Sequence, residues 1–144
     1  MKRFFLLFLL LATCLQTAYA GLNGDEKAIR EILSTQVREW NNGHIDQYMA
    51  AGYWQSDSLL FIGKNGPKYG YKATLANYLK SYPDKEHMGM LSFEVISLTR
   101  LSPEYYFAVG KWALKRSAGD VDGSWTLLFR KIAGNWKIVA DHSS

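Results

Sequence analysis

Three histidines are the side chains of this chain best suited to exchange a proton near neutral pH, because the imidazole ordinarily titrates there. His44, His87 and His142 lie far apart in the sequence, and none belongs to an H-x-x-H or H-E-x-x-H pattern. Their spacing therefore gives no sign of a metal site. The sequence also lacks a phosphate-binding glycine loop, a nucleophile elbow and a dinucleotide fingerprint. We expect no metal and no cofactor, so any chemistry would be acid/base chemistry.

His142 is the candidate catalytic residue, because it ends a predicted strand whose side chains alternate in direction. Its face also carries Trp136, Ile138 and Ala140, whereas the opposite face carries Lys137, Val139, Asp141 and Ser143. The first face is the more apolar, so we expect it to point inward. There His142 would act as a general acid or base. The alternative is a structural histidine that forms hydrogen bonds at the edge of the sheet.

The elements that would position these residues are helices first and strands afterwards. Apolar periodicity predicts helices over residues 25–40, 45–51 and 71–82, and strands over 58–62, 90–101, 105–115, 124–132 and 136–142. Glycines and a proline between residues 63 and 70 predict a turn or short hairpin. Consecutive long strands joined by short turns pair antiparallel, so the fold class is α+β, with helices on one face of a curved sheet.

The first 20 residues have the three parts of a secretory signal peptide. Lys2 and Arg3 precede an apolar run, and Ala18-Tyr19-Ala20 is a small-x-small cleavage site. The apolar run is far shorter than the roughly 20 residues of a membrane-spanning helix. We therefore expect an exported protein, periplasmic or secreted, with residues 1–20 as signal and 21–144 as one domain. The alternatives are a retained N-terminal anchor and a lipoprotein attached through Cys14.

Cleavage would change the composition of the working domain. The removed segment contains Cys14, the single cysteine of the chain, so the domain would have no disulfide. Lys2 and Arg3 are two of 17 basic residues, against 13 acidic ones, so the net charge would fall from +4 to +2. This balance does not favour a nucleic-acid partner, nor stable membrane insertion after cleavage.

Three segments carry a resemblance to a known family. They are residues 36–46, which contain Trp40-Asn41-Asn42-Gly43; Phe61-Ile62-Gly63 with Gly70 and the helix after it; and residues 134–144. Together they resemble the nuclear transport factor 2-like superfamily, in particular an uncharacterised bacterial branch beside the SnoaL-like cyclases and ketosteroid isomerases. The resemblance implies a cone-shaped fold, in which a strongly bent antiparallel sheet wraps three N-terminal helices and leaves a pocket between helices and sheet. Some relatives are enzymes, and others bind a ligand or only dimerise, so the fold leaves the function open.

Within that fold, the resemblance and the strand pattern suggest a set of pocket residues. The candidates are Trp40, Tyr48, Tyr53, Trp54, Trp112 and Arg130. The aromatic residues combine an apolar body with a polar tip, which suits contact with a ligand, and Arg130 could hold an anion. The alternatives are ordinary core packing for the aromatic residues and a solvated or ion-paired sheet position for Arg130. The pair of aspartates that ketosteroid isomerases use has no convincing match.

Two functional hypotheses follow. The first is a protein that binds, and in the enzyme version transforms, a small apolar molecule in this pocket, with His142 as acid or base. The second is a non-catalytic homodimeric association module that pairs through the outer face of the sheet, where Phe107, Val109 and Val139 are expected.

Overall fold

The computed structural model describes residues 24–144. The predicted signal peptide and Cys14 lie outside the described residues. The first helix covers residues 24–41. The other elements are α2 (Ile45–Gly52), β1 (Leu60–Gly63), β2 (Gly66–Tyr69), α3 (Tyr71–Ser81), α4 (Lys85–Met88), β3 (Met90–Ser102), β4 (Tyr105–Lys115), β5 (Val121–Ile132) and β6 (Asn135–Ser143). No helix within residues 24–144 is long and apolar enough to cross a membrane.

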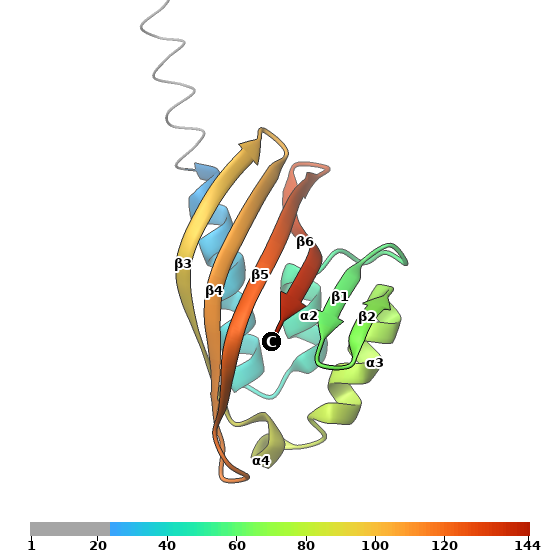
Figure 1. Ribbon diagram of the computed structural model, residues 1–144, viewed down its shortest axis with the longest axis vertical. Coiled ribbons are helices and arrows are strands. Elements are labelled where there is room, and N and C mark those ends of the chain that lie inside the picture. Colours follow the sequence, from blue (N-terminus) through green and yellow to red (C-terminus); the bar gives the residue numbers. More distant parts are fainter. Residues whose placement is uncertain (1–23) are drawn as a thin grey trace, which may run out of the picture.

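The six strands form one curled, unclosed sheet in the order β2-β1-β6-β5-β4-β3. Strands β3 to β6 form the expected antiparallel meander, and in Figure 1 the long strands curve around the first helix. The α+β cone-like class is therefore confirmed. Residues 63–70 form the turn and second strand of a hairpin, and β1 pairs in parallel with β6. Pro67 is accommodated because β2 is an edge strand.

The W-N-x-G segment joins the first helix to the sheet. Trp40 is buried, and its indole nitrogen donates to the Met88 carbonyl at 3.2 Å. The Asn41 side chain both donates to the Leu91 carbonyl, at 3.1 Å, and accepts from the Leu91 amide, at 2.7 Å. Gly43 has φ +88°, a conformation that residues with a side chain rarely adopt. The motif therefore ends the helix and pairs its end with the start of β3.

The opposite end of the first helix is held to the sheet by Asp25. One carboxylate oxygen accepts hydrogen bonds from the Lys131 ammonium, at 2.9 Å, and from the Trp136 indole, at 3.0 Å. Burial acts to raise the pKa of Asp25, but these two hydrogen bonds and the Lys131 charge hold it below its ordinary value. The helix is thus fixed at both ends against the concave face of the sheet.

Strand β6 contains one extra residue relative to its neighbour β5. Phe129 pairs with Ile138, but the preceding Leu128 pairs with Ala140, so Val139 is unmatched. Such a bulge reverses the alternation of side chains beyond it. Trp136 and Ile138 face the core as expected, whereas after the bulge it is the odd-numbered residues of the strand that turn inward.

Candidate functional site

A pocket of about 600 Å³ lies between the concave face of the sheet and the helices. The sheet side of the pocket is mainly apolar, and the helix side is rich in hydroxyl and amide groups. The apolar residues are Phe61, Leu91, Phe93, Trp112, Leu114, Val121, Trp125, Leu127 and Ile138. The polar residues of the helix side include Gln36, Tyr48, Tyr53, Asn77, Tyr78, Ser81 and Tyr82, and β6 of the sheet adds Asp141 and Ser143. This division suits a ligand with an apolar body and a few polar atoms.

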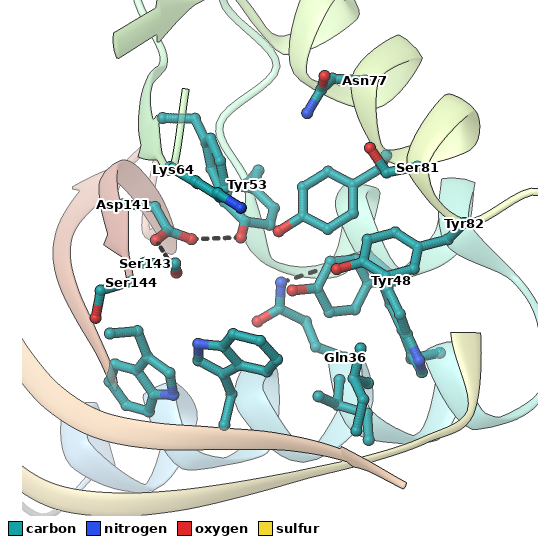
Figure 2. A pocket seen from close by; sticks show the side chains of 18 of the residues that line it. Gln36, Tyr48, Tyr53, Lys64, Asn77, Ser81, Tyr82, Asp141, Ser143 and Ser144 are labelled. Carbon is teal, nitrogen blue, oxygen red and sulfur yellow. Dashed lines mark hydrogen bonds between the residues drawn. The ribbon is translucent and has the colours of Figure 1, made fainter. Parts of the chain in front are cut away.

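Asp141 is the acidic side chain of this pocket. It lies on β6 just beyond the bulge and is only 4% exposed. One of its oxygens accepts a hydrogen bond from the Tyr53 hydroxyl at 2.6 Å, and the other accepts from the Ser143 hydroxyl at 2.7 Å. Figure 2 shows the three side chains joined at one side of the pocket. Each carboxylate oxygen has a further lone pair, so both can also accept from a ligand.

Burial raises the pKa of Asp141 to about 6, because the charged form loses its hydration. The hydrogen bonds from Tyr53 and Ser143 act in the opposite direction, since they favour the carboxylate. A carboxyl with a pKa near 6 is mostly ionised at pH 7, yet readily takes up a proton. Asp141 is therefore suited to act as a general base, and as an acid at slightly lower pH.

The phenol groups around Asp141 are firmly neutral. Burial, and after it the charge of Asp141, raises the pKa of both Tyr48 and Tyr53 well above the ordinary value. Burial is also the main cause of the raised pKa of Tyr78, to which the charge of Asp141 contributes. The rings of Tyr48 and Tyr78 have centroids 5.6 Å apart. The hydroxyls of Tyr48 and Tyr78 can therefore donate hydrogen bonds to a ligand oxygen, whereas the Tyr53 hydroxyl already donates to Asp141, and none of the three acts as a base.

Gln36 projects from the first helix into the same space. It is 1% exposed, and its amide nitrogen donates to the Tyr48 carbonyl at 3.3 Å. In Figure 2 its side-chain oxygen points away from Tyr48, toward the interior of the pocket. A β-carbon at Gly52 would overlap the Gln36 side chain, so glycine at this position leaves room for the amide. Gln36 thus adds a fixed acceptor on the helix side.

The structure contradicts the inward orientation expected for His142. His142 is exposed and pairs with Thr126 on β5 and Ile62 on β1. The expectation assumed unbroken alternation along the last strand, whereas the extra residue at Val139 reverses it. The ionisable side chain of β6 that faces the pocket is therefore Asp141, the residue directly before His142.

Of the six other expected pocket residues, four line the pocket. These are Trp40, Tyr48, Tyr53 and Trp112. Trp54 does not, although its backbone amide donates to the Ile138 carbonyl at 3.0 Å. Arg130 is exposed, and its guanidinium lies 5.7 Å from the centre of the Tyr105 ring. The expected pocket position of Arg130 is wrong, because the inward residues of β5 are Trp125, Leu127 and Phe129.

Sequence reasoning missed Asp141, Gln36 and the contribution of Tyr78. Gln36 is a polar residue on the apolar face of an amphipathic helix, and this pattern could have indicated that its side chain enters the pocket. For Asp141 no local signal distinguishes a bulged strand from a regular one. Among residues 24–144, no group of three His, Cys, Asp or Glu side chains is placed to hold a metal ion.

Comparison with known proteins identifies similar structures. No protein-family model matches the chain, and no curated protein matches it. An NTF-2 like protein of unknown function from Shewanella oneidensis MR-1 is 41% identical, with a TM-score of 0.79, over 83% of this chain and 98% of that chain. A ketosteroid isomerase-like protein from Erwinia carotovora atroseptica is 17% identical, with a TM-score of 0.62, over 82% and 93% of the two chains. A hexachlorocyclohexane dehydrochlorinase, LinA type 2, is 13% identical, with a TM-score of 0.69, over 87% of each chain. The last two likenesses concern the fold alone.

Proposed function

Because this chain belongs to the nuclear transport factor 2-like family, we propose that it binds a small, mostly apolar molecule in its pocket and transforms it by acid/base chemistry at Asp141. The observation that carries the proposal is a carboxyl group, 4% exposed, within the lining of a pocket of about 600 Å³. Burying an ionisable group costs free energy, and strongly perturbed carboxyls are concentrated at functional sites. The isomerase-like and dehydrochlorinase structures that share the fold are consistent with such chemistry.

The residues divide into three roles in this proposal. Asp141 accepts a proton from the ligand and returns it at another atom. Tyr53 and Ser143 hold the carboxylate in place through hydrogen bonds of 2.6 and 2.7 Å. The hydroxyls of Tyr48 and Tyr78, which remain protonated, donate to an oxygen of the ligand that gains negative charge.

The test compares molecules retained by the wild type and by Asp141→Asn. Both proteins are expressed in the original host, and native mass spectrometry followed by chromatography of the released molecule identifies what each retains. We expect the variant to hold a substrate and the wild type to hold its product, or nothing. The same molecule in both would argue for binding without chemistry, and an empty pocket in both would count against the whole proposal.

We also propose that the domain is exported after cleavage near Ala20, the alternative being lipid attachment at Cys14. The support is the tripartite pattern of residues 1–20. The intact mass of protein recovered from the host decides between these two forms. A mass that includes residues 1–20 without lipid would contradict both.

A second candidate function, a homodimeric association module, is favoured by the outer face of the sheet. Phe107, near the start of β4, is 38% exposed, and Ile96 on neighbouring β3 is 56% exposed. Pairing through this face would bury both side chains. Light scattering at micromolar concentration is expected to give twice the monomer mass. A monomer, or a dimer unaffected by Phe107→Glu, would contradict this assignment.

A further inference from the structure

Three basic residues stand among those that line the pocket: Lys64, Lys68 and Arg116. We call them the cationic rim. Lys64 lies in the turn between β1 and β2, Lys68 lies on β2, and Arg116 directly follows β4. Both lysines are exposed, so they stand at the entrance rather than inside.

Carboxylates do not neutralise this rim. Within residues 24–144, none of the three cations has a carboxylate oxygen within 4.0 Å. The Arg116 guanidinium instead donates to two carbonyls, those of Gly119 at 2.7 Å and His87 at 3.3 Å. These contacts fix its position without an ion pair; the Asp120 carboxylate accepts from the backbone amide of Arg116, at 2.9 Å, rather than from its guanidinium. Asp141 is the one acidic side chain among the lining residues.

The rim and Asp141 are separated by a distance that the sheet defines. Phe61 pairs with Asp141 on β6 and with Lys68 on β2. Since neighbouring strands lie about 4.8 Å apart, the backbones of Lys68 and Asp141 are about 10 Å apart. Lys64 lies in the turn that directly follows β1, three residues beyond Phe61. A molecule whose head binds at the rim can therefore extend its body past Phe61 toward Asp141.

We propose that the pocket selects amphipathic carboxylates, whose anionic head is held by Lys64, Lys68 and Arg116 and whose apolar body lies against Trp112 and Trp125. This inference rests on the proposed ligand-binding function and adds the class of ligand. Uncompensated charges around an entrance between apolar walls attract ions of opposite sign. The apolar sheet side of the pocket then accommodates the body, and the polar groups of the helix side meet the part of the molecule that reaches Asp141.

The test uses three probes that share one apolar chain: decanoate, decanol and decylammonium. Calorimetry measures their binding to the full domain and to the double variant Lys64→Gln, Lys68→Gln. We expect decanoate to bind most tightly and decylammonium least. Two ion pairs at an exposed entrance are each worth up to about 1 kcal/mol, so the variant should bind decanoate roughly tenfold more weakly. Binding of decanol should be unchanged, and added salt should weaken decanoate alone.

The matched control is Lys72→Gln, Lys80→Gln, which removes the same charge from two exposed positions of α3 outside the pocket lining. It is expected to bind decanoate like the wild type. Equal binding of decanol and decanoate, or an equal loss in the control variant, would overturn the proposed ligand class and leave the pocket function standing. Failure of all three probes to bind would overturn the ligand class and also count against the proposed binding function.

Discussion

Replacing Asp141 with asparagine should change how the stability of the domain depends on pH. The carboxyl is buried in the pocket, and burial raises its pKa from 3.8 to about 6. Asparagine has nearly the same shape: its carbonyl oxygen can accept from one of the Tyr53 and Ser143 hydroxyls, and its NH2 group can donate to the oxygen of the other. The substitution therefore removes the titration while retaining most of the packing around it.

The size and sign of the effect follow from proton linkage. A pKa raised in the folded state means that the folded protein binds more protons than the unfolded chain between pH 3.8 and about 6. The contribution of Asp141 to stability is then fully present below pH 3.8 and is lost as the pH rises through about 6. Each pKa unit corresponds to 1.36 kcal/mol, so the charged form costs about 3 kcal/mol relative to the protonated form.

Urea unfolding followed by tryptophan fluorescence, from pH 4 to pH 8, measures this cost. The free energy of unfolding of the variant minus that of the wild type should be about 2 kcal/mol more positive at pH 8 than at pH 4, which is less than the full cost of about 3 kcal/mol because the unfolded carboxyl is already partly ionised at pH 4. Other carboxylates, such as Asp25, titrate in both proteins and cancel in the difference. Asp122→Asn, at an exposed position of β5, is the control and should show no such change. A difference that is independent of pH, or that has the opposite sign, would refute the buried charge on Asp141.

Three further substitutions test the same site and its frame. Tyr53→Phe removes a hydrogen bond that favours the carboxylate, so it should raise the pKa of Asp141 further and cost about 1–3 kcal/mol of stability at neutral pH. Carbon NMR of the Asp141 carboxyl measures the titration, and an unchanged pKa would contradict this. Gly110→Ala places a β-carbon against both the Trp125 ring and the Glu94 backbone carbonyl and should destabilise the fold by about 1–3 kcal/mol in urea unfolding, whereas wild-type stability would contradict this close packing. His142→Ala, on the outer face, should change stability by less than about 0.5 kcal/mol and leave decanoate binding unchanged, and a loss of binding would restore the sequence-based interpretation.

The candidate site shows which pocket residues can be predicted from local sequence patterns and which cannot. The resemblance, the strand pattern and the polar tips of aromatic side chains correctly predicted Trp40, Tyr48, Tyr53 and Trp112 as pocket residues, but the same reasoning was wrong for Trp54. The error at His142 has a single cause, the unmatched Val139 in β6. A bulge depends on pairing with another strand, so the sequence of β6 by itself does not reveal it.

The β1–β2 hairpin and the parallel pairing of β1 with β6 illustrate a second limit of prediction from the sequence. Glycines in residues 63–70 correctly predicted a reversal of the chain. However, β1 joins the sheet beside β6, almost 80 residues later, and this contact brings Phe61 next to Asp141. Nothing in either segment specifies that partner, because the choice depends on which sheet edge remains open once the meander has formed.

The sequence by itself determined the order of the three longer helices and the four long strands, the α+β class and the aromatic character of the interior, but not the short helix α4. These follow from periodicity, turn residues and composition, all of which act over a few residues at a time. Only the tertiary structure decided which ionisable group enters the pocket and which cations surround it. Those outcomes depend on strand register and on contacts between distant segments, and a shift of one residue exchanges His142 for Asp141.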